Sequence, residues 1–249
     1  MIDLAGALDW VARGGTVIGL GGWVFVFLRH RILRRRTYRF FGGRTIEVFL
    51  PLRTLEGRPA VAEPDFQAGL LLQQLLTRYG LRASFRFLSP GWEPSFDADG
   101  AVVVCGPKSN RYVGQRLTGD PRVRFVEKGE HQWLLRAMVA GRPVGYRSPR
   151  DREGAAAERA DIGYLSRTVE GRGRGRQIPV LWIAGIHAEG SVAVADWLAG
   201  GDSLRRLGAQ ARRGDFSAII SGRYSEAPLR INDSQLIVLV EGRPRSARS

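Results

Sequence analysis

Two short stretches in the middle of the chain are continuously apolar, which is the pattern of a strand covered on both faces. They are Ala101–Cys105 (AVVVC) and Ile178–Ala184 (IPVLWIA). Strands of this kind are typical of parallel sheets flanked by helices. Weaker or alternating patterns predict further strands at Thr45–Leu52, Ala83–Leu88, Val123–Val126, Pro143–Tyr146, Ile162–Val169, Ser217–Ser221 and Gln235–Glu241.

Helical periodicity alternates with these strands. The segment from Phe66 to Tyr79 places apolar residues on one broad face, with Asp65 as its cap and Gly80 as its stop. Shorter helices are predicted at Tyr112–Leu117, Ser191–Leu198 and Leu204–Arg212. This alternation favours the α/β class, with a mostly parallel, Rossmann-like sheet sandwiched by helices.

The N-terminal stretch is uncharged from Gly14 to Leu28 and is followed at once by arginines. This run is shorter than the ~20 residues that span a bilayer, but the residues before it can lengthen the helix. Positive charge after the apolar run, rather than before it, argues against a cleavable signal peptide. The positive-inside rule then predicts a single-pass cell-membrane protein with its N-terminus outside and its main domain cytoplasmic. The membrane-flanking basic residues are Arg29, Arg31, Arg34, Arg35 and Arg36.

The same segment leaves two alternatives open, a helix lying in the membrane interface and a buried helix of a soluble domain. Small-residue spacings such as Gly15/Gly19 would let two anchors approach, so a homodimer through this helix is a further expectation. The predicted organisation is an anchor at 1–28, a basic juxtamembrane linker at 29–44, an α/β domain at 45–242 and a basic tail at 243–249. Two similar strand–loop–helix units raise the alternative of two halves that divide near 150–160.

Composition excludes several kinds of site. The net charge is +14 and the cations are almost all arginine, a bias that a GC-rich genome also produces. One cysteine, Cys105, allows no intrachain disulfide, and three histidines with one cysteine cannot form a standard structural zinc site. We therefore expect no metal and no cofactor. The arginine clusters could contact phosphates, but no recognised nucleic-acid motif accompanies them, so nucleic acid is not an expected partner.

A loop suited to anions follows the first buried strand. Gly106 allows close approach of a ligand to the backbone, and a cation, a hydroxyl and an amide follow it, ahead of a helix N-terminus. Lysine occurs only twice in the chain, at Lys108 and Lys128. The loop matches neither Walker A nor G-x-G-x-x-G, and the alternative is an ordinary turn with Ser109 or Asn110 as helix cap. The predicted ligand-binding residues are Gly106, Lys108, Ser109 and Asn110.

The second buried strand is followed by the loop GIHAEGS. His187 and Glu189 are the candidate catalytic residues, because an imidazole beside a carboxylate can do acid/base chemistry. The partner motifs of zinc deaminases and of serine hydrolases are absent, which makes Ser191 a better cap than nucleophile. The alternative is a loop histidine bonded to local backbone. The predicted ligand-binding residues of this loop are Gly185, Gly190 and Ser191.

The segments VVVCGPKSN and VLWIAGIHAEGSVAVADWL resemble uncharacterised bacterial membrane-tethered α/β (Rossmann-like) proteins, some of which carry regulatory modules. The resemblance is confined to these segments. It implies a bacterial source and a ligand-binding sheet, and it implies no reaction.

In open α/β sheets, ligands bind beyond the carboxyl ends of the strands, so we expect both loops at one crevice. Asp161 and Tyr164 could face the same crevice. The favoured function is a membrane-anchored cytoplasmic ligand-binding or sensor module for a small anionic, nucleotide-like ligand, with the lipid bilayer as its second partner. The alternatives are a nucleotide or N-glycosidic bond hydrolase acting through His187 or Glu189, and a structural or assembly protein.

Overall fold

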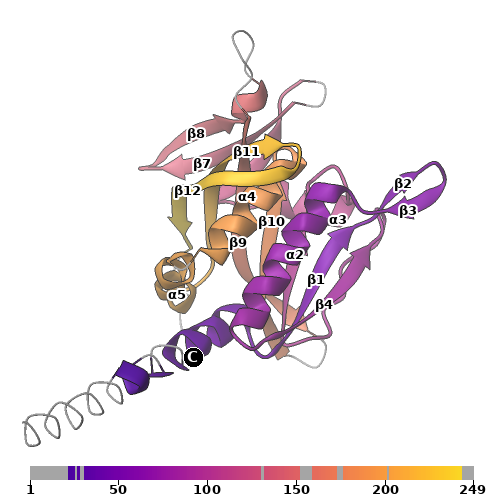
Figure 1. The fold of residues 1–249 in the computed structure, drawn as a ribbon. Helices are drawn as coiled ribbons and strands as arrows, with labels where there is room; N and C mark the ends of the chain where they lie inside the picture. The colour runs from indigo at the N-terminus through magenta and orange to yellow at the C-terminus, as the bar shows by residue number, and fades with distance from the viewer. Residues whose placement is uncertain are drawn as a thin grey trace, which may run out of the picture.

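A computed structural model describes residues 22–25, 27–28, 31–129, 132–151, 159–172, 176–200 and 202–242. A seven-stranded sheet runs through the middle of this part of the chain, in the order β12-β11-β9-β10-β5-β1-β4 (Figure 1). Its strands are β1 (Thr45–Pro51), β4 (Arg82–Leu88), β5 (Gly100–Val104), β9 (Ala160–Arg172), β10 (Arg176–Gly185), β11 (Phe216–Glu226) and β12 (Leu229–Glu241).

One half of the large sheet is parallel and the other half is antiparallel. The parallel half contains β4, β1, β5 and β10, in which β1 pairs with both β4 and β5. The antiparallel half begins where β9 and β10 form a long hairpin, and it continues through β11 and β12. The sheet is therefore mixed, and its topology changes at β10.

Helices cover one face of this sheet. α2 (Glu63–Arg78) and α4 (Ala188–Ala199) pack against each other there (Figure 1). They enclose the larger apolar core, which α5 (Ser203–Arg213) completes through Leu204 and Leu207. Residues 31–41, predicted as part of a basic linker, are helical, and this helix ends with Phe40 and Phe41 buried in the same core.

The opposite face carries α3 (Arg111–Thr118) and a second, three-stranded antiparallel sheet. Phe125 of that sheet packs on Tyr164, and Leu135 and Trp182 belong to the same separate apolar cluster. Its strands are β6 (Val123–Glu127), β7 (Trp133–Val139) and β8 (Arg142–Arg147), and the 3-10 helix η1 (Pro149–Asp151) follows them. A two-stranded hairpin of β2 (Arg53–Leu55) and β3 (Arg58–Ala60) projects from the end of β1 (Figure 1).

The predicted fold class, a mostly parallel Rossmann-like sheet sandwiched by helices, is wrong. Strand accounts for 44% of the described structure and helix for 32%, with a mixed large sheet and additional antiparallel sheets. The error lies in the connections. Residues Glu170–Arg172 and Arg176–Gln177 extend the two predicted strands into the β9–β10 hairpin, and strands joined by so short a connection pair as antiparallel neighbours.

The predicted membrane anchor also requires correction. Among the described residues, no helix is long and apolar enough to cross a membrane. The described helix of residues 31–41 carries five arginines and buries Phe40 and Phe41 in the protein core, so it is not apolar enough to cross a bilayer. This finding contradicts the predicted transmembrane helix and the single-pass cell-membrane localisation. Residues 1–21 and Arg29, including the glycine pair proposed for a homodimer, lie outside the described residues.

The helix α4 approaches the sheet closely at two glycines. A Cβ built on Gly163 of β9 would lie 2.3 Å from the carbonyl oxygen of Gly190, and one built on Gly190 would lie 2.5 Å from the carbonyl oxygen of Ile162. Backbone cannot move aside as a flexible side chain can. Only glycine, which has no Cβ, therefore allows the beginning of α4 to pack this closely on the sheet.

We expect Gly163→Ala to lower the free energy of unfolding by about 2–4 kcal/mol, because the added methyl group overpacks backbone against backbone. Gly171→Ala in the same strand is the matched control, since nothing lies within 4 Å of a Cβ there. Urea denaturation of both variants measures the difference. Equal stability of the two variants would show that α4 is not held as closely as described.

Candidate functional site

The carboxyl ends of three parallel strands, β1, β5 and β10, meet at one edge of the large sheet. The chain leaves β1 toward α2 on one face of the sheet and leaves β5 toward α3 on the opposite face. Such a change of face between neighbouring parallel strands opens a crevice outside their carboxyl ends, where ligands of α/β proteins bind. The beginnings of α2 and α4 point to this same edge.

A cavity of about 310 Å³ lies in this crevice, and both predicted loops line it. Its volume is within the range of small-molecule sites. The lining residues are Arg53, Asp65, Gly106, Pro107, Lys108, Ser109, Arg150, Gly185, Ile186, His187, Ala188, Glu189 and Ser191. The structure thus brings together seven of the nine residues predicted for the two loops.

The two remaining predicted residues have structural positions. Asn110 is buried and caps α3, since its side-chain oxygen accepts from the backbone N–H of Val113 at 3.0 Å. Its amide donates to the carbonyl oxygens of Ser89 and Trp92, so it also holds the preceding loop. Gly190 lies behind the cavity wall, where it allows the close contact of α4 with β9.

A buried carboxylate holds the turn that carries His187. Oδ2 of Asp161 accepts from the backbone N–H groups of His187 at 3.0 Å and of Gly190 at 2.7 Å. Asp161 is fully buried, and burial raises the pKa of this carboxyl group, while the charge of His187 opposes the shift. Asp161 therefore fixes the turn from behind the cavity, which sequence reasoning had only placed near the crevice.

Tyr164, the other residue expected to face the crevice, does not line it. Its side chain lies on the face of the large sheet that α3 and the small sheet cover. Its hydroxyl donates to Oδ2 of Asp120 at 2.6 Å, and Ser217 donates to the same oxygen. Arg122 pairs with the other oxygen of Asp120 at 3.0 Å, and the pKa of Asp120 is held below its ordinary value by Arg122 and these hydrogen bonds in spite of burial. This network fastens the small sheet to the large one.

Both candidate catalytic residues have charged partners at the cavity. Nε2 of His187 lies 2.8 Å from Oδ1 of Asp151 in η1, and Glu189 pairs with Arg150 at 3.1 Å. A carboxylate bonded to one ring nitrogen orients an imidazole. The segment before β9 therefore supplies partners that sequence spacing could not reveal, 36 and 39 residues away.

Asp65 and Arg53 were missed as site residues. Asp65 was expected to cap the helix, but α2 begins at Glu63 and Asp65 lies in its first turn, 3% exposed, at the cavity wall. Arg53 pairs with it at 3.3 Å from the start of the β2–β3 hairpin. Burial raises the pKa of Asp65 from 3.8 to about 6, against the opposing charge of Arg53. A strongly perturbed carboxyl group in a crevice is typical of a functional site.

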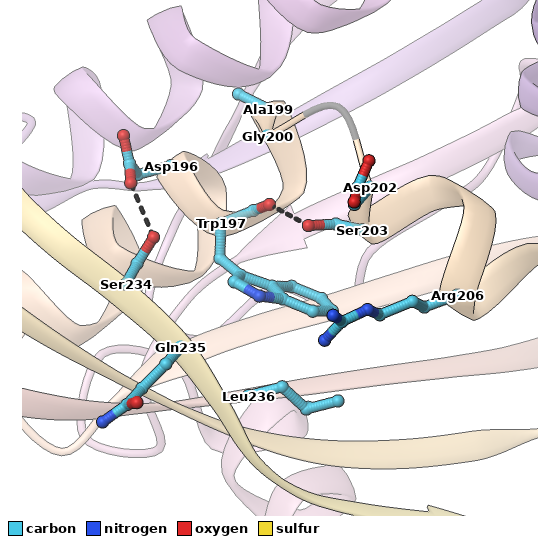
Figure 2. Close-up of a pocket in the computed structure, with 10 residues that line it drawn as sticks. All are labelled: Asp196, Trp197, Ala199, Gly200, Asp202, Ser203, Arg206, Ser234, Gln235 and Leu236. Atoms are coloured by element: carbon cyan, nitrogen blue, oxygen red, sulfur yellow. Dashed lines mark hydrogen bonds between the residues drawn. The ribbon is translucent and has the colours of Figure 1, made fainter.

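A larger cavity, of about 740 Å³, lies between the end of α4, the start of α5 and β12 (Figure 2). Asp196 accepts from Ser234 at 2.7 Å, and Arg206 reaches toward Trp197 (Figure 2). The length of α4, about 18 Å at the usual helical rise, separates this cavity from the carboxyl ends of the parallel strands. None of the residues predicted from the two loops lines it, so the crevice remains the better candidate.

Asp161 gives a first test of the site. Asp161→Ala removes the acceptor of the His187 N–H group and leaves the Gly190 N–H group only its longer bond, 3.2 Å, to the carbonyl oxygen of His187. We therefore expect a loss of about 2–4 kcal/mol in the free energy of unfolding. Asp161→Asn retains an acceptor oxygen of the same shape and should lose much less. Chemical denaturation of both variants separates these outcomes, and equal losses would mean that the negative charge, rather than the acceptor, matters.

The raised pKa of Asp65 makes stability depend on pH. Because the folded state holds the proton more tightly, the contribution of Asp65 to the free energy of unfolding is greatest below pH 3.8 and is lost as the pH rises toward 6. Asp65→Asn removes this loss, so the variant should be more stable than the parent at pH 7 by up to about 3 kcal/mol. The difference should shrink at pH 4.5, and Asp202→Asn, at an exposed carboxylate, should show no such pattern.

Comparison with known proteins adds no assignment to this geometry. No protein-family model matches the sequence, and no curated protein and no solved structure matches it either.

Proposed function

We propose that the crevice binds a small anionic, nucleotide-like ligand and that the domain acts as a ligand-binding or sensor module. The observation that carries the proposal is the convergence of both glycine-containing loops on one cavity at the carboxyl ends of β1, β5 and β10. This is where α/β proteins receive ligands, and neither loop alone made the case from sequence.

The charges at the cavity favour the binding of an anion. Three cationic side chains and two carboxylates line it, and the first turn of α4 adds backbone N–H groups and the positive end of a helix dipole. The side chains of Arg53 and Arg150 are 51% and 44% exposed, so their guanidinium groups are solvated and can turn toward a bound phosphate. Phosphate and carboxylate are the groups that this combination of donors suits best.

A second candidate function is hydrolysis in the same cavity. The observation that favours it is the His187–Asp151 pair at the cavity, because an imidazole oriented by a carboxylate can act as a general acid or base. Glu189, the other candidate for acid/base work, pairs with Arg150. This ion pair occupies the carboxylate of Glu189, which leaves His187 as the stronger candidate for acid/base chemistry.

Lys108 provides the direct test. Lys108→Ala should weaken the binding of nucleotides and of inorganic phosphate about tenfold, the usual worth of one charged hydrogen bond, and leave the melting temperature nearly unchanged. Lys128→Ala is the matched control, because it removes the only other lysine, which lies between β6 and β7 outside the cavity. Isothermal titration with a panel of nucleoside mono-, di- and triphosphates and phosphate itself measures both.

The same incubations, followed by chromatography, separate binding from turnover. Products that disappear with His187→Ala would establish the hydrolase and set aside the sensor. Binding without products supports the sensor. Absence of binding for every anion in the panel would contradict the proposal.

A further inference from the structure

The mixture of donors and acceptors at the crevice limits what its ligand can be, if the crevice binds an anion as proposed above. The wall presents donors: Lys108, Ser109, Ser191 and the beginning of α4. It also presents the carboxylates Asp65 and Glu189. A ligand that filled this space with negative charge alone would meet two acceptors as well as the donors.

The two carboxylates face a shared space from different elements. Asp65 comes from the first turn of α2 and Glu189 from the first turn of α4, and the charge of Glu189 is close enough to raise the pKa of Asp65. Each is paired with an arginine of its own, at 3.3 Å for Asp65 and 3.1 Å for Glu189. Ion pairing holds both groups in place, and carboxylates in such positions accept hydrogen bonds from hydroxyl or amine groups.

Size and lining argue against a lone phosphate as the ligand and against a nucleobase held inside the cavity. A cavity of about 310 Å³ offers the volume of about ten water molecules, more than a lone phosphate fills. Apart from the imidazole of His187, no aromatic ring is among the described residues that line it. Proteins commonly hold a nucleobase by stacking it on aromatic side chains, and this wall provides no such platform.

We propose that the crevice takes a phosphorylated sugar. Its phosphate lies at the beginning of α4 beside Lys108, and its hydroxyl groups donate to Asp65 and Glu189. Where the ligand is a nucleotide, the ribose phosphate occupies the cavity and the base lies outside it. Neutral hydroxyl groups explain how one cavity can carry two carboxylates at its wall and still accept an anion.

The test compares four probes on the full chain by isothermal titration: ribose 5-phosphate, inorganic phosphate, unphosphorylated ribose and adenosine monophosphate. Ribose 5-phosphate should bind at least tenfold more tightly than phosphate or ribose, and adenosine monophosphate within a few-fold of ribose 5-phosphate, because each hydrogen bond to a charged group contributes about that factor. Asp65→Asn and Glu189→Gln should each weaken the binding of ribose 5-phosphate about tenfold, while the affinity for phosphate stays the same or increases.

Asp65→Asn is expected to be more stable than the parent protein at pH 7, so a loss of affinity in it does not report unfolding. Asp202→Asn, which lines the other cavity, is the control and should bind all probes as the parent does. Phosphate and ribose 5-phosphate of equal affinity, or variants that weaken both equally, would overturn the sugar assignment and leave anion binding intact. If adenosine monophosphate binds more than tenfold tighter than ribose 5-phosphate, the base contributes to binding, which would contradict its placement outside the cavity. Failure of all four probes to bind would overturn the anion site itself.

Discussion

The buried carboxylate of Asp161 stands behind the turn between β10 and α4, and the geometry of the crevice depends on it. It accepts hydrogen bonds from the backbone N–H groups of His187 and Gly190 in the interior. Glycine at 163, 185 and 190 lets backbone approach backbone around this carboxylate, where any Cβ would lie within 3 Å of another atom. Together they set the direction in which α4 leaves the sheet and thus where its N-terminus points.

The charges at the crevice are arranged at a cost to stability. Asp65 is buried with one arginine partner, and burial raises its pKa, which means that the folded protein holds the ionised group less favourably than water does. A protein selected for stability alone would carry an apolar or amide side chain there. Retention of a carboxylate at the wall of a cavity agrees with a ligand that donates hydrogen bonds to it.

The mixed sheet explains why only one end of the molecule carries this crevice. Parallel neighbours β1, β5 and β10 end at the same edge, so their loops converge. The antiparallel strands β9, β11 and β12 alternate in direction and widen the sheet, and the segment before β9 brings Arg150 of η1 to the same edge. These strands also support α4 and, through Tyr164 and Ser217, attach the small sheet to the large one.

The sequence by itself determined the local features that short-range chemistry controls. The continuous apolar runs of β5 and β10 lie in the interior, the long helix between β1 and β4 forms, and the two glycine-containing loops follow the strands after which they were expected. Seven loop residues predicted for the site line one cavity, because loops after neighbouring parallel strands share an edge. The sheet order and the partners Asp65, Arg53, Arg150 and Asp151 were decided only by the tertiary structure. Hydrophobic periodicity indicates which face of a strand is buried but not which strand lies beside it. Ion pairs between segments that are distant in the sequence cannot be predicted from the spacing of nearby residues.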